Sequence, residues 1–570
     1  VWSVRKAGLG LLMGNPGPRK ALAVIEDAAL PLRYMYDYYR DVKKIISYYN
    51  IEAVYYGHAS VGLIHIRPKL DLSIDKDRRV MENIAKDVSK IVKKYKGSLS
   101  GEHGDGRIRA PYLEEQFGEE VYQLLVNLKN KFDSKNLLNP GVIIGNSPIT
   151  KNLKSVAQIN NDIKTAYDWT DDVSFFYAAE KCNGAGVCRK SSGNGVMCPS
   201  YQATRVEEYS TRGRANLLRR ALNSKEPLKA LNNNELRIAL DLCLGCKACK
   251  SECPASVDMA KLKSEYLYQT KDQQNQFEIW RTKNLGLLLR LGSKNPKIFN
   301  FLQNLNFTKK IIKLDGHLPQ IQQETLSKWW EGRDQSIDKK NQITVWVLCD
   351  IYTEFYDSQI GKDLLEFLIL CKVNIKLVNL DSSIALLVSK GLLKEAKDSI
   401  NKHYEILGNI PKKDFIMGIE PSEVLAWKDD CKHLKADQIL SVNLPEELII
   451  QLNKSNLLPN LKPLDLSVCI HLHCHQRSLS NEKITIDALS LIPKLKVEVL
   501  DTGCCGMAGD FGYKHRELSK VIFNNLIIKN NHIIKEHDFF VVTGSSCSSQ
   551  YKKLSNSKVQ NIFHIFGLAV

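Results

Sequence analysis

The feature that most constrains this chain is a dense run of cysteines in CLGCKACKSECP, where Cys243, Cys246, Cys249 and Cys253 precede a proline. Gaps of two residues let three thiolates converge from one tight loop on a single inorganic cluster, and a final proline is typical of 4Fe-4S proteins. Paired cysteines also bind structural zinc, but four in this dense order favour iron and sulfide. We therefore expect the chain to wrap at least one 4Fe-4S cluster.

A second group of cysteines lies upstream, in the segments CNGAGVC and MCPSY. In two-cluster ferredoxins the fourth cysteine of each run ligates the other cluster, so an upstream cysteine should complete the first cluster. The expected ligands are Cys198, Cys243, Cys246 and Cys249 for the first cluster, and Cys182, Cys188 and Cys253 for the second.

The second cluster is short of one thiolate, because Ala185 stands where its fourth ligand would be. Three outcomes remain open: a three-iron cluster, a ligand other than cysteine, or no second cluster. Arg212 and Arg214 follow in the segment TRGRAN. We expect arginines beside a cluster to hydrogen-bond the backbone that wraps it, and plain surface charge is the alternative.

Cysteine usage and charge bound the class of protein. The chain has 570 residues and 15 cysteines, none of which precedes Cys182. Metal-type spacings in place of a disulfide framework predict a reducing compartment, hence the cytosol. No apolar run approaches the roughly 20 residues of a membrane span. The net charge of +17 is spread over every segment without a nucleic-acid-binding motif, so nucleic acid is not expected as a partner.

The pattern of apolar residues divides the chain into segments of different fold. Strands that alternate with helices predict an α/β arrangement near the C-terminus, whereas the cysteine-bearing middle reads as helical. The expected fold class is multidomain, with an α+β domain at 1–150, a linker at 151–175, an α-helical ferredoxin-type domain at 176–270, a helical connector at 271–340, and α/β cysteine-rich repeats at 341–435 and 460–570.

Histidines, a glutamate and glycines mark the first 150 residues. Ala53–His58 and Gly62–Arg67 read as two strands joined by a short turn, and the numbers of His58 and His65 are symmetric about it. The two histidines should therefore lie opposite one another across the strand pair, where they can share one metal. Glu102, in SGEHGDG, would supply an oxygen ligand, and two His with one carboxylate leave positions open for substrate.

These segments match a known family in order as well as content. WSVRKAG, IEDAALP, YGHASVGLIHIRP, SGEHGDG and LLNPG resemble the C-terminal domain of FAD-linked oxidases, the D-lactate, glycolate and D-2-hydroxyglutarate dehydrogenases of the vanillyl-alcohol-oxidase fold. The cysteine module resembles that of fused bacterial versions. Those also carry a cysteine-rich region like that of heterodisulfide reductase and of the anaerobic glycerol-3-phosphate dehydrogenase. The resemblance covers nearly the whole chain.

The resemblance implies roles for individual residues. It makes His58, His65 and Glu102 the ligands of a divalent metal, zinc or manganese, and His103 the base that takes the substrate hydroxyl proton. Arg67, two residues beyond His65 on the same strand face, is an added candidate for an anionic substrate group, with a surface arginine as the alternative. Further expected contacts are Arg5 with the substrate carboxylate, Asn139 with flavin, and Gly104 and Gly106 with the cofactor through close backbone approach.

The C-terminal repeat carries cysteines in HLHCHQ, TGCCGMAG and GSSC. By the resemblance, these residues would hold a further iron–sulfur centre or line an acceptor site, and buried free thiols are the alternative. The residues concerned are Cys474, Cys504, Cys505 and Cys547.

The earlier repeat lacks such cysteines. Ser382 and Ser383 stand where the cysteine pair would be, and Glu423 replaces the final cysteine. Serine and glutamate are poor partners for iron–sulfur chemistry, so this repeat is expected to be structural. The remaining thiols, Cys349, Cys371, Cys431 and Cys469, are expected in apolar cores.

The resemblance implies an FAD- and iron–sulfur-dependent oxidoreductase that oxidises a D-2-hydroxy acid. D-lactate is the first expectation, and D-2-hydroxyglutarate or glycolate comes next. The flavin carries the hydride chemistry, and the clusters at 182–253 pass electrons to a quinone or a carrier protein. The rival is a non-catalytic electron-transfer subunit, but a pure relay has no need of a proton base such as His103. Peripheral contact with the inner face of a membrane is left open.

Two departures from the family pattern bear on these expectations. Ile25 and Glu26 occupy the stretch where some relatives carry a lysine, which bears on the choice of substrate. The family's flavin-binding domain lies N-terminal to this region, and the residues after Val1 read like the inside of a domain. We therefore expect a fragment that lacks this domain and is inactive alone.

Overall fold

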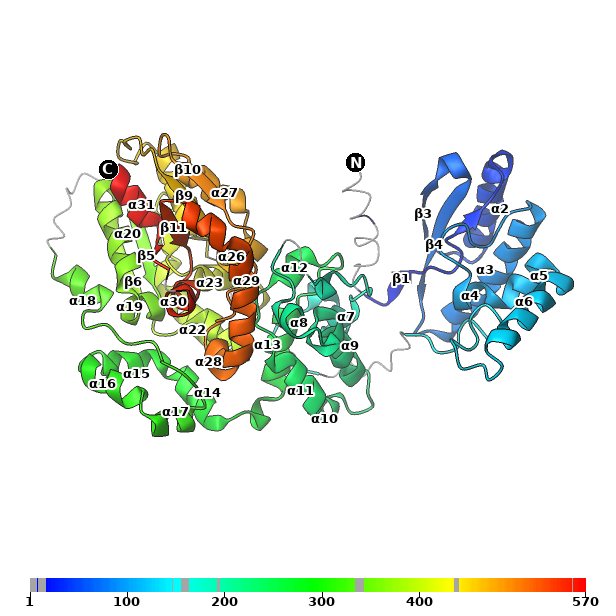
Figure 1. Cartoon of the computed structure of the whole chain (residues 1–570), viewed down its shortest axis with the longest axis horizontal. Helices are drawn as coiled ribbons and strands as arrows, with labels where there is room; N and C mark the ends of the chain where they lie inside the picture. The colour runs from blue at the N-terminus through cyan, green and yellow to red at the C-terminus, as the bar shows by residue number, and fades with distance from the viewer. Residues whose placement is uncertain are drawn as a thin grey trace. The chain divides into compact units, whose positions relative to one another are not determined.

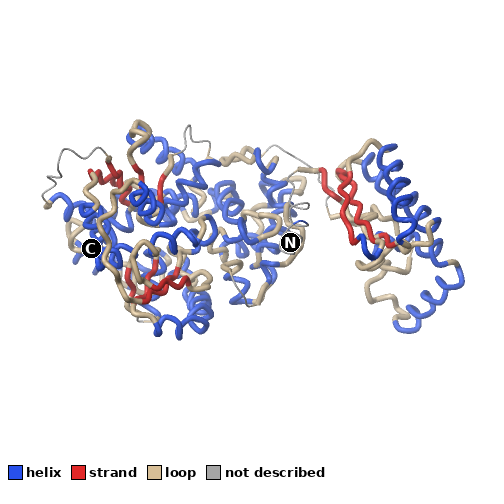
Figure 2. Tube along the Cα trace, turned by 90° about the horizontal axis from the view of Figure 1, so that it is seen from above, coloured by secondary structure: helices blue, strands red, loops and turns tan. Residues whose placement is uncertain are grey.

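The computed structural model describes residue 8 and residues 17–145, 147–154, 163–191, 195–333, 343–434, 440–555 and 557–570. The chain divides into two compact units, Val1–Asn160 and Asn161–Val570 (Figure 1). Helix and sheet are mixed, as expected, and the strands form three separate sheets (Figure 2). Among the described helices, none combines the length and the apolar character that crossing a bilayer requires.

The first unit is built around one long strand, β4 (Leu63–Asp71). β3 (Ala53–His58) pairs with it antiparallel along one edge. The short strands β1 (Arg19–Ala21) and β2 (Ala28–Ala29) pair with the two ends of the other edge. Because side chains alternate along β4, one face of the sheet carries Ile66 and Leu70, and the other carries the histidines.

Two amphipathic helices cover the apolar face of this sheet. α2 (Met35–Tyr48) and α3 (Asp75–Lys94) bury their apolar stripes in one core with Ile66 and Leu70. Because α2 and α3 occupy this face, the histidine face is left to the loops. The remaining elements are η1 (Leu32–Tyr34), η2 (Ala59–Val61), α4 (Gly106–Arg109), η3 (Ala110–Tyr112), α5 (Leu113–Phe117) and α6 (Glu119–Phe132).

The turn between β3 and β4 sets a different register from the symmetric one expected. The turn is the 3-10 segment η2 closed by Gly62 in the left-handed region at φ 73°. A Cβ at Gly62 would meet the Leu30 carbonyl oxygen at 2.0 Å, so only glycine fits there. The ladder consequently pairs His65 with Tyr56 and His58 with Leu63. The expectation that the two histidines lie directly opposite is therefore wrong: they are diagonal neighbours on one face.

The cysteine-bearing part of the second unit is helical. Its long loops hold most of the cysteines, while short helices pack between them around buried residues such as Leu218 and Leu262. Its elements are η4 (Thr170–Asp172), α7 (Phe175–Glu180), η5 (Val187–Arg189), α8 (Pro199–Thr204), η6 (Glu207–Tyr209), α9 (Thr211–Leu222), α10 (Pro227–Ala230), α11 (Asn234–Asp241), α12 (Ala248–Glu252) and α13 (Met259–Gln269).

A string of short helices follows and runs along one edge of the second unit (Figure 1). Prolines and asparagines separate them, and each spans about two turns or fewer. They are η7 (Lys271–Gln273), α14 (Gln276–Lys283), α15 (Leu285–Gly292), α16 (Pro296–Gln303), α17 (Asn306–Ile312) and α18 (Leu326–Glu331).

The rest of the chain forms two parallel sheets of identical topology. In each, the first strand lies between the second and third, and the fourth lies beyond the third. The first sheet contains β5 (Thr344–Cys349), β6 (Asn374–Asn379), β7 (Phe415–Gly418) and β8 (Val442–Asn443). The second contains β9 (Ser467–His471), β10 (Lys496–Val499), β11 (Phe539–Val542) and β12 (Val559–Gln560).

The helices of these repeats pack in equivalent pairs. α20 (Ser358–Leu370) of the first repeat contacts α31 (Ile562–Ala569) of the second, and α25 (Pro445–Lys454) contacts α27 (Glu482–Leu489). Both sheets contribute to one shared core, so the repeats form a single body. The first repeat also contains α19 (Ile351–Phe355), α21 (Ile384–Ser389), α22 (Leu393–Leu407), α23 (Pro421–Leu425), the π-helix η8 (Ala426–Asp430) and α24 (Cys431–His433).

The helical cysteine module packs directly on the second repeat. α12 contacts α26 (Cys474–Leu479), and α8 contacts α29 (Arg516–Glu536), as Figure 1 shows in green against orange. The remaining helices of this repeat are α28 (Phe511–Lys514) and α30 (Ser545–Leu554). These contacts place cysteines from distant parts of the sequence in neighbouring layers.

Candidate functional site

Three imidazoles converge on one carboxylate oxygen in the first unit. The Nε2 atoms of His58 and His65 each lie 3.2 Å from Glu102 Oε1, and that of His103 lies 3.4 Å from it. The rings of His65 and His103 stack with centroids 5.2 Å apart. Strands β3 and β4 position the first two histidines, and the loop before α4 positions the other two residues. The site therefore brings together all four residues expected at a metal and base.

The hydrogen bond at His65 Nδ1 fixes the chemistry of its other nitrogen. His65 is buried, and its Nδ1 lies 2.5 Å from the backbone carbonyl oxygen of Glu26. A carbonyl can only accept, so Nδ1 carries a proton. In the neutral ring, Nε2 then presents a lone pair toward the Glu102 carboxylate. Two acceptors at this separation need a proton or a metal ion between or beside them, and this donor set is one that a divalent metal fits.

His103 is held by a buried carboxylate. Its Nδ1 lies 3.0 Å from Glu26 Oε1, which leaves Nε2 toward the interior of the site. Arg109 Nη2 also donates to Glu26 Oε1 at 3.3 Å, and both Arg109 and Glu26 are buried. An imidazole whose Nδ1–H is held by a carboxylate has its Nε2 free to take a proton.

Asp27 closes the loop that carries Glu102 and His103. Its carboxylate is fully buried and accepts the Ser100 hydroxyl at 2.6 Å and the His103 amide at 2.8 Å. The amides of Gly101 and Glu102 donate to it as well. Burial alone would raise the pKa of Asp27, but these hydrogen bonds outweigh it and hold the pKa below its usual value.

A ligand atom of Asp27 also lies within 4.8 Å of those of His65, Glu102 and His103. Four donors converge on Asp27 Oδ2 and close the loop, which leaves Oδ1 as the atom that could reach a metal ion. Asp27, Glu26 and Arg109 were not singled out from the sequence as site residues. The nearest signal was IEDAALP, a motif far from SGEHGDG in the chain.

The other residues expected in this unit have different placements. Arg67 is buried, so the alternative of a surface arginine is wrong, and its Nε donates to the Tyr56 hydroxyl at 2.7 Å. Asn139 is exposed with a left-handed backbone at φ 50°. Gly104 and Gly106 also have positive φ, and a Cβ at either would meet no atom within 4 Å. Arg5 lies outside the described residues.

In the second unit, three cysteines of one loop and a fourth from a distant part of the sequence line one pocket. Leu244, Arg214 and Met259 complete much of the remaining wall. This grouping matches the ligand set predicted for the first cluster, and thiolates on all sides of an enclosed space fit a 4Fe-4S cube. The four cysteines are Cys198, Cys243, Cys246 and Cys249.

N–H groups point at the sulfurs of this pocket. Arg214 is fully buried and donates from Nη1 to Cys198 Sγ at 3.4 Å and from Nε to the Ala239 carbonyl. The Met259 amide donates to Cys249 Sγ at 3.3 Å. The sequence predicted arginine contacts to backbone alone. Hydrogen bonds to ligand sulfur stabilise extra negative charge, so they raise the reduction potential of a bound cluster.

The three cysteines expected to hold a second cluster differ in how deeply they are buried. Cys182 and Cys188 are buried, and the Arg212 amide donates to Cys188 Sγ at 3.4 Å. Arg212 Nη1 also donates to the Gly184 carbonyl at 3.3 Å, as predicted for an arginine beside such a loop. Cys253 is half-buried and Ala185 is exposed.

The cysteines of the C-terminal repeat form a linked series. Side-chain hydrogen bonds join Cys474 to Cys504, Cys504 to Cys505, and Cys505 to Cys547. All four are buried, and they follow strands β9, β10 and β11 at one edge of the second sheet. The carboxyl ends of adjacent parallel strands are where ligands commonly bind. The Gly506 amide donates to Cys504 Sγ at 3.5 Å.

The first repeat has a hydrogen-bonded carboxylate in place of this series. Glu423 is buried and accepts from the Ser383 hydroxyl at 2.6 Å and from the Ile384 amide at 2.8 Å. Burial raises the pKa of Glu423 to about 7, although both hydrogen bonds act to lower it. The other thiols, Cys349, Cys371, Cys431 and Cys469, are buried in apolar cores, as predicted.

The cluster loop and the C-terminal cysteines are in direct contact. His475 Nε2 lies 2.8 Å from the Gly245 carbonyl, and the Ser478 hydroxyl donates to the Cys246 carbonyl at 3.0 Å. Burial, and then the Cys474 thiol, raise the pKa of Cys246 well above its usual value.

Comparison with known proteins identifies both parts. Residues 1–143 match the family of FAD linked oxidases, C-terminal domain, and residues 178–257 match the 4Fe-4S dicluster domain. The resemblances drawn from the motifs are thereby confirmed. The first match includes the histidine site, and the second includes the four cysteines of the pocket.

Three relatives show the range of similarity. A D-2-hydroxyglutarate dehydrogenase of Haemophilus influenzae is 27% identical over 97% of this chain and 59% of its own length. A D-lactate dehydrogenase of Archaeoglobus fulgidus is 33% identical over 22% of this chain and 28% of its own. One component of the anaerobic glycerol-3-phosphate dehydrogenase of Escherichia coli is 26% identical over 36% of this chain and 53% of its own. The chain thus spans about 59% of the first relative's length.

Proposed function

We propose that this chain, with its FAD linked oxidase C-terminal domain and its 4Fe-4S dicluster domain, belongs to an enzyme that oxidises a D-2-hydroxy acid and passes the electrons to iron–sulfur centres. The observation that carries the proposal is the convergence of three imidazole Nε2 atoms on Glu102. Oxidation of an alcohol requires a group that removes the hydroxyl proton, and this site offers one beside a cation site.

His103 is the proposed general base. Glu26 holds its Nδ1, and Arg109 keeps the Glu26 carboxylate paired, so the basic Nε2 faces the site. A positioned base of this kind contributes about 10²- to 10⁴-fold to rate. The stacked ring of His65 restricts rotation of His103.

His58, His65 and Glu102 are the proposed ligands of a divalent ion. Such an ion would act as a Lewis acid on the substrate hydroxyl, lowering its pKa. The Glu26 carbonyl orients His65 so that its Nε2 faces the ion, which is the usual arrangement around ligating histidines.

A bound flavin would accept the two electrons of the substrate C–H bond and release them one at a time. On this chain Asn139, Gly104 and Gly106 are the proposed contributors to its site, with Arg5 for the substrate carboxylate. Asn139, Gly104 and Gly106 all have left-handed backbone, and no atom of the described residues within 4 Å would block the approach of a ligand to either glycine.

We favour D-2-hydroxyglutarate as the substrate over D-lactate, our first expectation from sequence, and over glycolate. The relative matched along nearly the whole chain is named for D-2-hydroxyglutarate, whereas the one named for D-lactate matches 22% of it. Arg67 supports this order, because a buried guanidinium on the strand face of His65 suits a second carboxylate. D-lactate has no second carboxylate for Arg67 to bind.

The cysteines provide the proposed path for the electrons. The first cluster would be held by Cys198, Cys243, Cys246 and Cys249 and a second by Cys182, Cys188 and Cys253. The path would end at a further centre held by Cys474, Cys504, Cys505 and Cys547. Contact of α26 with the loop at Gly245 and Cys246 supports the order of these sites. A quinone or a carrier protein would receive the electrons.

The test uses the whole enzyme to which this chain belongs, flavin-binding domain included, purified without oxygen and loaded with FAD. D-2-hydroxyglutarate should reduce a soluble dye, and His103→Asn should lower kcat by about 10²- to 10⁴-fold. His537→Asn, in the second cysteine-rich repeat, is the control and should be unaffected. The proposal fails if no hydroxy acid reduces the dye, or if His103→Asn keeps the full rate.

Substrate choice is tested at Arg67. Arg67→Met should raise KM for D-2-hydroxyglutarate by roughly 10- to 100-fold while changing KM for D-lactate little, since a charged hydrogen bond contributes about 1.5–3 kcal/mol. Arg67→Lys should restore part of the difference. Equal losses for both acids would indicate a structural role only.

The rival proposal, a non-catalytic electron-transfer subunit, makes a different prediction for Cys246→Ser. In the enzyme, this change should abolish electron delivery to the acceptor but leave hydroxy-acid-dependent bleaching of the flavin. A relay subunit would show no bleaching with any hydroxy acid, before or after the substitution.

A further inference from the structure

Three consecutive helices of the second unit expose large apolar side chains. On α16, Ile298 and Phe301 are 60% and 67% exposed, and Phe307 on α17 is 76% exposed. On each helix these residues recur at three- or four-residue spacing, so they share one face. We call this set the α15–α17 face; it consists of Leu287, Leu291, Ile298, Phe301, Leu302, Leu305, Phe307 and Ile311.

The same segment is rich in cations and has no carboxylates. Residues 284–314 contain no aspartate or glutamate. Among the described residues, salt bridges reach only Arg290 of its six cations, and the other five have no ion-pair partner. The cations are Arg290, Lys294, Lys297, Lys309, Lys310 and Lys313.

Another helix with exposed apolar residues, α6, does not have this excess of cations. α6 of the first unit exposes Leu124 and Phe132, but two glutamates and two lysines share that helix. Mixed charge beside an apolar stripe suits a protein partner. In segment 284–314 the charged residues that accompany the apolar face are all cations, and this combination complements an anionic surface.

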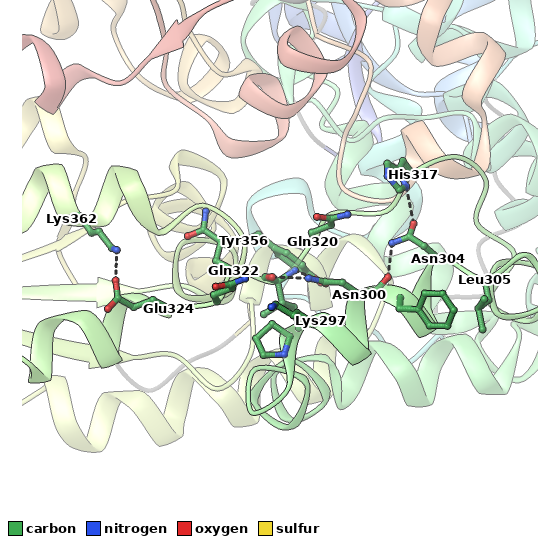
Figure 3. Close-up of a pocket in the computed structure, with 14 residues that line it drawn as sticks. Lys297, Asn300, Asn304, Leu305, His317, Gln320, Gln322, Glu324, Tyr356 and Lys362 are labelled. Carbon is green, nitrogen blue, oxygen red and sulfur yellow. Dashed lines mark hydrogen bonds and ion pairs between the residues drawn. The ribbon is translucent and has the colours of Figure 1, made fainter.

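A pocket opens beside this face. It has a volume of about 940 Å³, and Phe301 and Leu305 belong both to its wall and to the face. Figure 3 shows His317 against Asn304, with Nδ1 3.0 Å from Asn304 Oδ1. Leu318, the next residue, packs in one buried core with Cys505 and Cys547. The pocket wall is therefore one residue removed from the core that contains the C-terminal cysteines.

We propose that the α15–α17 face binds an anionic lipid surface. Short helices with Phe and Leu on one face and lysines beside them lie in the headgroup region, with the apolar side chains entering the acyl boundary. Each lysine near such a surface adds attraction, and phenylalanines add burial. These helices span two turns each, so they lie on the surface and do not cross it. Bound this way, the pocket faces lipid, where it is open to a lipid-soluble acceptor.

The proposal is tested by flotation of the whole chain with vesicles. Phosphatidylcholine vesicles containing phosphatidylglycerol should bind the protein, and pure phosphatidylcholine vesicles should bind it far less. Lys294→Glu with Lys297→Glu should weaken binding roughly thirtyfold or more, because each lysine near the surface contributes about fivefold. Phe301→Glu with Phe307→Glu should weaken it similarly, and added salt should weaken wild-type binding.

The matched control places the same two glutamates elsewhere. Val521 and Ile528 are exposed apolar residues on α29, and Val521→Glu with Ile528→Glu should leave vesicle binding unchanged. Equal binding by wild type and both face variants would overturn the proposal. So would a change in self-association of the face variants without vesicle binding, which would make a second copy of the chain the occupant. Vesicle binding needs neither flavin nor substrate, so its failure would leave the proposed oxidation untouched.

Discussion

The two C-terminal repeats have one fold and two kinds of loop. Both sheets have the same strand order and are parallel throughout, and their helices pair in equivalent positions. After its strands, the second repeat carries four linked cysteines. The first repeat carries Ser383 and Glu423, which hydrogen-bond each other at 2.6 Å. The sheet therefore stands without the cysteines, and the loops alone differ in chemistry.

The first repeat also shows which hydrogen-bond acceptor its loop has in place of cysteine thiols. The Ile384 and Ala385 amides and the Ser383 hydroxyl all donate to Glu423. Those donors lie at the start of α21, where unpaired amides would otherwise be buried. The Glu423 carboxylate satisfies them. In the second repeat, a thiol accepts instead, since the Gly506 amide donates to Cys504 Sγ.

The largest expected effect comes from making the second repeat resemble the first. Cys505→Ser should remove iron from the C-terminal repeat and abolish reduction of the terminal acceptor, while the fold remains intact as in the first repeat. Iron and sulfide analysis with circular dichroism measures both. The reverse change, Ser383→Cys, is the control and should gain no iron. Unfolding of Cys505→Ser would show that the repeats differ in more than their loops.

The second largest effect is expected from removing the ion pairs of Lys390, which link the two repeats. Lys390 of the first repeat lies 2.7 Å from Asp510 Oδ2 of the second and 3.0 Å from Glu278 Oε1. Lys390→Met should lower the free energy of unfolding by up to about 3 kcal/mol, because both partly buried carboxylates lose this lysine and keep Lys514 as a partner. Chemical denaturation measures this. Lys402→Met, which breaks an exposed pair with Asp381, should cost less than about 0.5 kcal/mol. Equal costs would mean that the repeats do not depend on this tie.

The third prediction, Glu423→Ala, tests whether the Glu423 carboxylate stabilises the loop of the first repeat. Removing the carboxylate leaves three buried donors unsatisfied, at an expected cost of about 2–3 kcal/mol. Hydrogen exchange of the α21 amides should rise accordingly. Protection that stays at the wild-type level would show that water replaces the carboxylate.

The smallest expected effect is a pH dependence at the same residue. Burial raises the folded-state pKa of Glu423 to about 7, above its usual value. The folded state therefore binds the extra proton, so its contribution is full below the unfolded pKa and is lost as pH rises through 7. Relative to Glu423→Gln, wild type should lose about 2 kcal/mol between pH 5 and pH 8. A constant difference between the two proteins would place the Glu423 pKa near its ordinary value.

The sequence predicted the structure well where the spacing of residues along the chain determines which of them come together. The intervals between cysteines predicted the grouping around Cys198, and apolar patterns predicted strands such as Ala53–His58. It failed where a turn decides geometry, because the 3-10 turn at Ala59–Val61 shifts the pairing of His58. It also missed Glu26 and Arg109, since only the folded sheet brings them to His103.

The contact between α26 and the loop at Gly245 and Cys246 has a kinetic consequence. Both ends of that junction belong to one polypeptide, so on the proposed path electrons would cross it without any encounter between separate molecules. Dilution cannot slow this step, and no competing carrier can intercept it. The rate per enzyme molecule of every step before the final acceptor should therefore not depend on protein concentration.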